Sequence, residues 1–264
     1  MAKVAFAYLG GKTRAATRIA SLIPAGLLVS PFLGGGAVEL TVAGRGDRVA
    51  GFDAHLPVAT FWQWQLYDPE ALSVAVARTF ASVPTSTEFE AMKRAMAEMD
   101  FSVELAAAFY VVQRLSAYGM GVNGGFWAGS RERFGPGTYE RIRTFKMPSL
   151  SVGHSDFRET LARFPEHFAY LDPPYRLARK GGEKLYGFCG ELHRNFPHFE
   201  LFELLKDRPN WLMSYGDVDE IAWLYEGFPI RKLSWDYTAA GNGTRREGKE
   251  LLIASRNLRS LLEG

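Results

Sequence analysis

The feature that most constrains the fold is a short apolar run, Phe168–Leu171, that ends in Asp172-Pro173-Pro174-Tyr175. An aromatic or aliphatic run that stops at a polar break predicts a buried strand followed by a loop. Ligands of open α/β sheets bind beyond the carboxyl ends of the strands, so this loop is predicted to lie at a binding site. Because the two prolines fix their φ angles and carry no N–H, the loop offers a carboxylate, rigid carbonyl acceptors and an aromatic ring. That combination suits a planar group with an exocyclic amine, whereas an isolated tetrapeptide of this kind is more often a surface turn.

Three consecutive glycines, Gly34-Gly35-Gly36, follow a second apolar run at residues 27–32 and precede a helix-compatible stretch. Strand, glycine turn and helix form the first unit of a nucleotide-binding α/β fold, because glycines let a ligand approach the backbone closely. The next predicted strand, residues 48–52, ends at Asp53. Asp53 stands close to the roughly 20-residue spacing at which an acidic side chain accepts both hydroxyls of a ribose.

Near the N-terminus, Lys12 follows Tyr8 and two glycines and precedes a helix predicted for residues 13–23. The order glycine, lysine, threonine is typical of the end of a phosphate-binding loop, but that motif requires a glycine where Phe6 stands. The sequence therefore argues against such a loop and leaves a backbone turn with a lysine and an aromatic ring beside it.

The middle of the chain, residues 55–119, has helical periodicity, and residues 87–90 have the form of a capping box. Residues 118–137 are rich in glycine and aromatic residues and predict a hairpin or a loop. The α/β pattern then resumes, with a pair of antiparallel strands predicted around a loop at 239–248. The later strands are predicted at residues 150–152, 168–171, 211–214, 230–235 and 251–254.

Composition narrows the class of protein. A chain of 264 residues with 47% hydrophobic content can bury one core and a modest insertion. We expect no transmembrane helix and no secretory signal, because no sufficiently long apolar run occurs. The single cysteine, Cys189, suits a reducing cytoplasm.

The net charge of +2 is only a weak sign of a polyanionic partner, but basic residues are concentrated locally. Basic runs occur at residues 130–148, just after the Asp-Pro-Pro-Tyr loop, and near residue 245. Each run alone is more often a solvated face, whereas together they can form one footprint for phosphates. The first run contains Arg131, Arg133, Arg141, Arg143 and Lys146.

The order YLGGK, PFLGGG, strand-end FD, helical insertion, SDF and LDPPY resembles the DNA adenine-N6 methyltransferase family typified by bacterial Dam enzymes. The resemblance covers nearly the whole chain, and several spaced motifs in the family's order are more specific than any one alone. It implies an α/β, Rossmann-like methyltransferase sheet that uses S-adenosylmethionine and carries an inserted helical target-recognition domain. Residues 1–55 and 146–264 would form the catalytic domain, and residues 56–145 the insertion that binds DNA.

The resemblance also implies roles for individual residues. Asp172 to Tyr175 would hold the target base, with Asp172, Pro173, Pro174 and Tyr175 as the catalytic set. The cofactor site would consist of Tyr8, Lys12, Pro31, Phe32, Gly34, Gly36, Asp53, Asp156, Phe157 and Asp172. Asn123, Arg131 and Arg133, with the glycines around them, are predicted to read base edges, and Arg141, Arg143 and Lys146 are predicted to contact phosphates.

The chain departs from the family pattern at two places. The family usually has a glutamate before its Pro-Phe, where this chain has Ser30, so one polar support of the glycine loop is missing or replaced. In many members an arginine-containing stretch precedes the asparagine of the recognition segment, but Gly121 and Val122 precede Asn123 here. The second departure concerns the target sequence more than the type of reaction.

We therefore expect a site-specific enzyme that methylates N6 of an adenine flipped out of double-stranded DNA, acts as a monomer or weak dimer, and needs no metal. It would be bacterial or phage-encoded and could belong to a restriction-modification system. Three alternatives remain at this point. The first is an amino methyltransferase that acts on cytosine N4, RNA or a glutamine amide, and the second is an inactive DNA-binding decoy. The third is a nicotinamide-dependent enzyme, which is disfavoured because the glycines of this chain do not form the GxGxxG motif.

Overall fold

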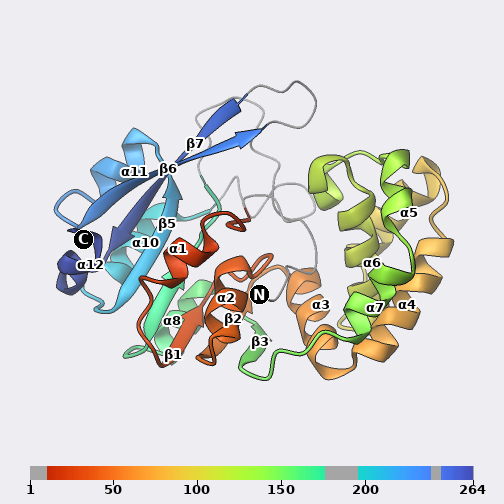
Figure 1. The fold of residues 1–264 in the computed structure, drawn as a ribbon, viewed down its shortest axis with the longest axis horizontal. Helices are drawn as coiled ribbons and strands as arrows, with labels where there is room; N and C mark the ends of the chain where they lie inside the picture. The colour runs from red at the N-terminus through yellow and green to blue at the C-terminus, as the bar shows by residue number, and fades with distance from the viewer. Residues whose placement is uncertain (1–10, 176–195, 239–244, 264) are drawn as a thin grey trace.

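The computed structural model describes residues 11–175, 196–238 and 245–263, and its centre is a seven-stranded sheet in the order β3-β2-β1-β4-β5-β7-β6 (Figure 1). Neighbouring strands from β3 to β5 pair in parallel, whereas β7 is antiparallel to both of its neighbours. The α/β fold and the antiparallel final pair predicted from the sequence are thereby confirmed. The strands are β1 Leu27–Ser30, β2 Arg48–Asp53, β3 Leu150–His154, β4 Phe168–Leu171, β5 Trp211–Gly216, β6 Ile230–Thr238 and β7 Arg245–Ala254.

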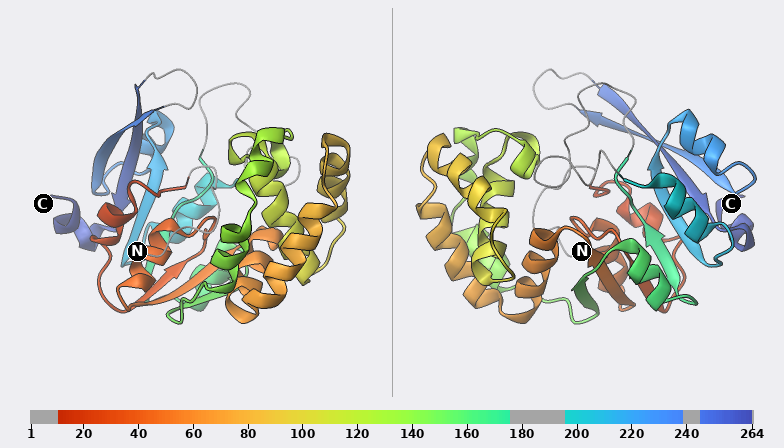
Figure 2. Two further views of the ribbon diagram at one scale, coloured as in Figure 1. Left: turned by 45° about the vertical axis from the view of Figure 1, so that its right-hand side comes forward. Right: turned by 180° about the vertical axis from the view of Figure 1, so that it is seen from behind.

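Helices cover both faces of the sheet, and alternate strand residues supply the two cores. Tyr170 and Leu212 belong to the core under α1, α2 and α12, while Leu171 and Met213 belong to the core under α8, α10 and α11. The view from behind in Figure 2 shows the second layer of helices. These helices are α1 Ala16–Ala20, α2 Ala37–Gly44, α8 Phe157–Arg163, α10 His198–Leu205, α11 Asp219–Leu224 and α12 Arg259–Glu263.

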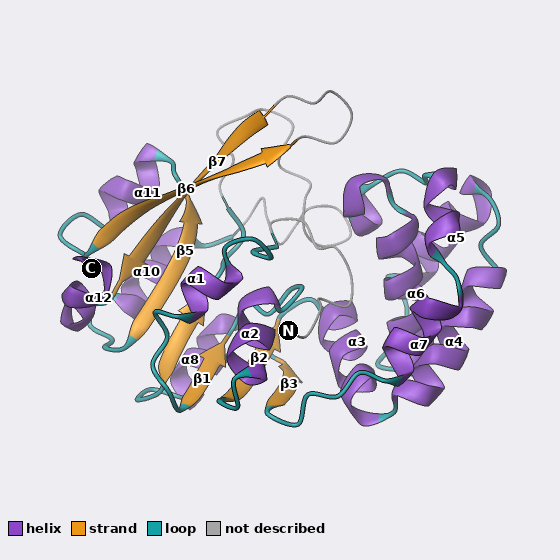
Figure 3. Cartoon of the chain, viewed as in Figure 1, coloured by secondary structure: helices purple, strands orange, loops and turns teal. Residues whose placement is uncertain are grey.

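The chain between β2 and β3 forms an all-helical unit beside the β3 edge of the sheet (Figure 3). Its centre is α6, where every residue from 105 to 113 is buried. The exact borders of this insertion as a separate recognition domain stay a prediction. Its α-helices are α3 Leu56–Tyr67, α4 Pro69–Ala81, α5 Ser86–Met96, α6 Val103–Leu115 and α7 Pro136–Arg143.

The structure corrects three local predictions. The capping box is formed by Thr85 and Glu88, two residues before the pattern at 87–90, so α5 begins at Ser86. The first helix, α1, is shorter than the predicted 13–23 stretch. The segment 118–137 does not form a two-stranded hairpin. Three short 3-10 helices, η1 Ala117–Gly119, η2 Gly121–Asn123 and η3 Ala128–Arg133, are joined to the end of α6 by one antiparallel bridge, Ser116 to Phe126.

No helix in the described ranges is both long and apolar enough to cross a lipid bilayer.

The insertion supports the glycine loop through Trp62 on α3. The ring of Trp62 is fully buried, and its Nε1 donates a 2.9 Å hydrogen bond to the carbonyl of Gly34. A methyl group added at Gly36 would meet the same ring at 3.3 Å. The first helix of the insertion is therefore part of the structure that shapes the loop.

We predict that Trp62→Phe lowers the free energy of unfolding by about 1–3 kcal/mol, because the half-buried Gly34 carbonyl loses its donor. Denaturant unfolding measures this change. Trp64→Phe on the same helix is the matched control, since the Trp64 Nε1 has no hydrogen-bond partner among the described residues. Equal losses for the two variants would contradict the role assigned to the Trp62 hydrogen bond.

Candidate active site

A cavity of about 330 Å³ lies at the carboxyl ends of β1, β2 and β4. It collects side chains from segments that are far apart in the sequence, as expected for the ligand site of an open α/β sheet. Of the predicted cofactor residues within the described ranges, all but Pro31 line it. Its lining includes Lys12, Phe32, Gly34, Gly36, Glu39, Asp53, Asp156, Phe157, Arg158, Asp172, Pro174 and Tyr175.

The glycine loop forms one wall of the cavity. Gly34 and Gly36 have φ angles of 48° and 66°, a left-handed conformation that side chains disfavour, so glycine is required at both positions. Gly36 is the N-cap of α2, which places the amino end of that helix at the cavity. The loop backbone is thus open to a ligand on the side where the helix dipole is positive.

Asp53, at the end of β2, fixes the glycine loop. Its Oδ2 accepts a 2.8 Å hydrogen bond from the Gly34 N–H, and its Oδ1 accepts a 2.9 Å bond from the His55 N–H. Burial raises the pKa of Asp53 to about 6, although both backbone donors act in the opposite direction. The carboxylate lines the cavity at the place predicted for a ribose-binding acid.

Asp156 and Phe157 lie on the other side of the cavity, at the start of α8. Asp156 is the N-cap of this helix, and its Oδ1 accepts hydrogen bonds from the backbone and the guanidinium of Arg158. The Phe157 ring stacks on Phe32, with centroids 5.7 Å apart, and also contacts Phe196. These aromatic rings give the cavity a flat apolar end beside a carboxylate.

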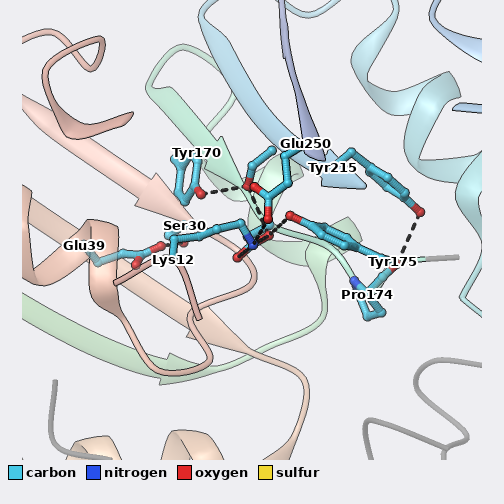
Figure 4. A network of polar contacts seen from close by, with 10 residues as sticks. Lys12, Ser30, Glu39, Tyr170, Pro174, Tyr175, Tyr215 and Glu250 are labelled. Atoms are coloured by element: carbon cyan, nitrogen blue, oxygen red, sulfur yellow. Dashed lines mark hydrogen bonds and ion pairs between the residues drawn. The ribbon is translucent and has the colours of Figure 1, made fainter. Parts of the chain in front are cut away.

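Figure 4 shows the polar network around Lys12 and Tyr175. Both donate to the carboxylate of Asp172, which accepts four hydrogen bonds from the described residues. Lys12 Nζ donates to both of its oxygens, at 2.7 and 2.8 Å. Its Oδ1 also accepts 3.1 Å bonds from the hydroxyls of Tyr175 and Ser214. Burial raises the pKa of Tyr175 well above its usual value, so this hydroxyl keeps its proton and acts as a donor.

The ring of Tyr175 is held in place by its neighbours. It stacks on Tyr215 with the centroids 5.1 Å apart, and Lys12 Nζ lies 4.6 Å from its centroid. The hydroxyl of Tyr215 donates to the carbonyl of Pro174 at 3.2 Å. Tyr215 therefore fixes both the ring and the backbone of the loop, whereas Pro173 is buried outside the cavity lining.

Sequence reasoning missed two carboxylates near Lys12. Glu250, on β7, lies 3.6 Å from Lys12 Nζ, and burial raises its pKa to about 7. Glu39, on α2, accepts a 2.6 Å hydrogen bond from Ser30, and burial raises its pKa to about 7 as well. Neither residue belongs to a local sequence motif. The sequence signal that could have indicated them is an acidic residue within an otherwise apolar strand or helix.

The predicted DNA-contacting residues fall into two groups. Arg131 is half-buried, its guanidinium donates to the carbonyl of Val83, and it lies 4.2 Å over the ring of Phe80. Asn123 is half-buried at the end of η2. The exposed cations are Arg141, Arg143, which pairs with Glu140, and Lys146.

Tyr8 lies outside the described residues, as do the basic run after Tyr175 and the tip of the loop between β6 and β7. The side chain of Arg133 is likewise not described.

We predict that affinity for S-adenosylmethionine, the ligand implied by the resemblance, falls as the pH is lowered through about 6. Asp53 has a raised pKa, so it is ionised above pH 6 and loses its charge below that value. Each lost charge-assisted hydrogen bond weakens binding by about 1.5–3 kcal/mol. Calorimetric titrations between pH 5 and pH 8 measure the effect. Asp53→Asn should bind more weakly at pH 8 and lose the decline near pH 6; an unchanged decline would remove Asp53 from the ligand site.

Comparison with known proteins identifies the family. No curated protein matches the chain. Among solved structures, it is similar to precorrin-6y C5,15-methyltransferase from Geobacter metallireducens at 6% identity and a TM-score of 0.44, over 97% of this chain and 96% of that one. It is also similar to precorrin 8w decarboxylase from Methanobacterium thermoautotrophicum at 14% identity and a TM-score of 0.36, over 91% and 88% of the two chains. At these scores neither structure bears on the chemistry. A model of the D12 class N6 adenine-specific DNA methyltransferase family, in contrast, matches residues 8–239, and because this range spans most of the chain, the protein belongs to that family.

Proposed function

We propose that the chain methylates N6 of an adenine that has been flipped out of double-stranded DNA, and that Asp172 to Tyr175 hold the base. The family supports S-adenosylmethionine as the cofactor and adenine in DNA as the substrate. The observation that carries the residue assignment is the position of Asp172, a strand-end carboxylate at the cavity beside a rigid prolyl loop and an aromatic ring. We also propose that the enzyme is cytoplasmic and acts as a monomer or weak dimer.

The residues of the cavity fit the cofactor. Asp53 offers a carboxylate to the ribose hydroxyls, and Phe157 with its neighbouring rings offers an apolar surface to the adenine. The lining carries four carboxylates, Glu39, Asp53, Asp156 and Asp172, against the two cations Lys12 and Arg158. A cavity with this excess of negative charge suits a ligand that carries a sulfonium and an ammonium group.

When bound, S-adenosylmethionine supplies an activated methyl group. The task of the protein is to orient an amine whose lone pair is delocalised into the base. Asp172 Oδ1 already accepts three donors, whereas Oδ2 accepts one from Lys12 and retains acceptor capacity. We assign Oδ2 to one amine hydrogen and a carbonyl of the Pro173-Pro174 pair to the other; Pro174 lines the cavity, and its carbonyl has a second lone pair besides the one that accepts from Tyr215. Two such acceptors favour a pyramidal nitrogen, and alignment in a cavity shielded from water contributes to the rate.

Tyr175 would form the platform for the base. A base inside the duplex cannot reach the cavity, so it must leave the stack and rest on an aromatic surface. Tyr215 keeps the Tyr175 ring from rotating. Lys12, which lies close to that ring, has Glu250 as a second carboxylate partner and therefore remains held while Asp172 engages the amine.

The helical insertion would bind the DNA around the flipped base. In Figures 1 and 2 the segment 117–133 and the paired ends of β6 and β7 that lie farthest from α12 are both on the upper side of the molecule. Trp127 in this segment is 44% exposed, a position from which an aromatic ring can contact a duplex. The exposed Lys146 and the arginines of α7 suit phosphates. Arg131 is engaged inside the insertion, so its first role is to hold the segment in shape.

We predict that Asp172→Asn reduces methyl transfer by at least about a hundredfold, because an amide is a weaker acceptor and cannot replace both charged oxygens. Transfer of labelled methyl groups to duplex DNA, followed by nucleoside analysis, measures this loss. Asp172→Ala should abolish transfer but also leaves the buried Lys12 without its main partner, a change that typically costs about 3–5 kcal/mol of stability. Asp217→Ala, which removes an exposed ion pair with Lys232, is the control and should keep full activity. Transfer by Asp172→Asn at the wild-type rate would refute the assignment.

We further predict different effects for two cations of the insertion. Lys146→Ala should weaken binding to all duplexes alike. It should also reduce the slope of log affinity against log salt concentration by about 1, the change expected when one phosphate contact is lost. Arg131→Ala should lower the melting temperature, because Val83 loses a donor and Phe80 loses its stacked guanidinium. Fluorescence anisotropy at several salt concentrations and thermal unfolding separate the two. An altered methylated sequence for Arg131→Ala with unchanged stability would show instead that Arg131 reads bases.

A further inference from the structure

The carboxylates that line the cavity differ in what balances their charge. Asp172 is paired with Lys12, and Asp156 with Arg158. Asp53 and Glu39 form no ion pair with any residue in the described ranges; Asp53 accepts from two backbone N–H groups, and Glu39 accepts from a hydroxyl. Asp53 lies at the end of β2, where the ribose is expected. Glu39 is therefore the lining acid for which no ligand group has yet been assigned.

The Glu39 carboxylate is buried and held by a hydrogen bond from a buried serine. It is 2% exposed, and Ser30, which donates the 2.6 Å hydrogen bond, is completely buried. Ser30 ends β1 and Glu39 lies in the first turn of α2, so the two elements on either side of the glycine loop hold one carboxylate between them. In Figure 4 the pair lies beside the side chain of Lys12.

The position of Glu39 in the helix indicates which part of the cofactor it meets. The amino end of α2 lies at the cavity, and its positive dipole suits the carboxylate of the cofactor's amino-acid portion. In that portion the ammonium group is attached to the same carbon as the carboxylate. A carboxylate side chain in the same helical turn is thus placed for the ammonium, whereas the sulfonium must face Asp172, where the amine is held.

We propose that Glu39, positioned by Ser30, binds the α-ammonium group of the cofactor. The inference rests on S-adenosylmethionine as the cofactor of the proposed function. It also accounts for the departure at position 30: this chain has serine where the family usually has glutamate, and the helix supplies a carboxylate that contacts the serine. Burial raises the pKa of Glu39 to about 7, and a bound cation would stabilise its ionised form.

Calorimetry with three ligands tests the proposal. S-adenosylmethionine and S-adenosylhomocysteine both carry the ammonium, only the first carries the sulfonium, and 5′-methylthioadenosine carries neither. For Glu39→Gln we expect the two amino-acid ligands to bind roughly tenfold to a hundredfold more weakly, and the neutral nucleoside to bind as it does to the wild type. Ser30→Ala should show a smaller loss in the same pattern. Glu98→Gln, the same substitution at an exposed glutamate, should change none of the three affinities.

The three ligands separate the possible failures. Equal loss for all three would show that Glu39 only shapes the cavity, and loss for S-adenosylmethionine alone would assign Glu39 to the sulfonium; either result overturns the proposal. A wild-type chain that binds none of the ligands would instead refute the proposed function. Titrations at pH 7 in buffers of different ionisation enthalpy add a second measurement: the wild type should release more protons on binding S-adenosylmethionine than Glu39→Gln does.

Discussion

The ion pair between Lys12 and Asp172 is the interaction on which the site depends. It joins residues 160 positions apart and connects the segment before α1 to the end of β4 at the centre of the sheet. The lysine side chain is 3% exposed, so neither charge could be left alone at this position without a large desolvation penalty. Replacement of such a pair by apolar residues often preserves stability, which suggests that its value here is orientation. It sets the direction of the Asp172 carboxylate, and the hydroxyls of Tyr175 and Ser214 complete the arrangement.

Around this pair, the cavity concentrates negative charge in a place with little water. Asp53, Glu39 and Glu250 all have raised pKa values because burial disfavours their ionised forms. A cationic ligand that enters the cavity would offset the free-energy cost of burying the ionised carboxylates. After methyl transfer the sulfonium charge opposite Asp172 is gone, whereas the ammonium and ribose groups assigned to Glu39 and Asp53 remain.

The sequence was a good guide to elements and motifs and a poor guide to contacts between them. The strand ends at Asp53 and Asp172 were predictable because periodicity and proline show where a strand must stop. The partners of those residues were not, since Ser214, Glu250 and Tyr215 come from strands that pair only in the folded sheet. The segment 118–137 was predicted as a hairpin or a loop. Its pairing is limited to one antiparallel bridge, which includes the bond from the Trp127 N–H to Leu115, and the rest forms short 3-10 turns with Phe126 packed on Phe89. Arg131 followed a basic pattern typical of nucleic-acid contacts, yet an acceptor on the α4–α5 connection engages its side chain.

The central claim is that this cavity serves methylation of adenine in DNA at one preferred sequence. Single-molecule sequencing of DNA from cells that express the protein tests it most directly, because base, position and context are read together. We expect N6-methyladenine at a recurring motif with the wild-type chain and strongly reduced methylation of that motif with Asp172→Asn. Methylation of cytosine N4, or the absence of methylated DNA from cells that contain folded wild-type protein, would contradict it.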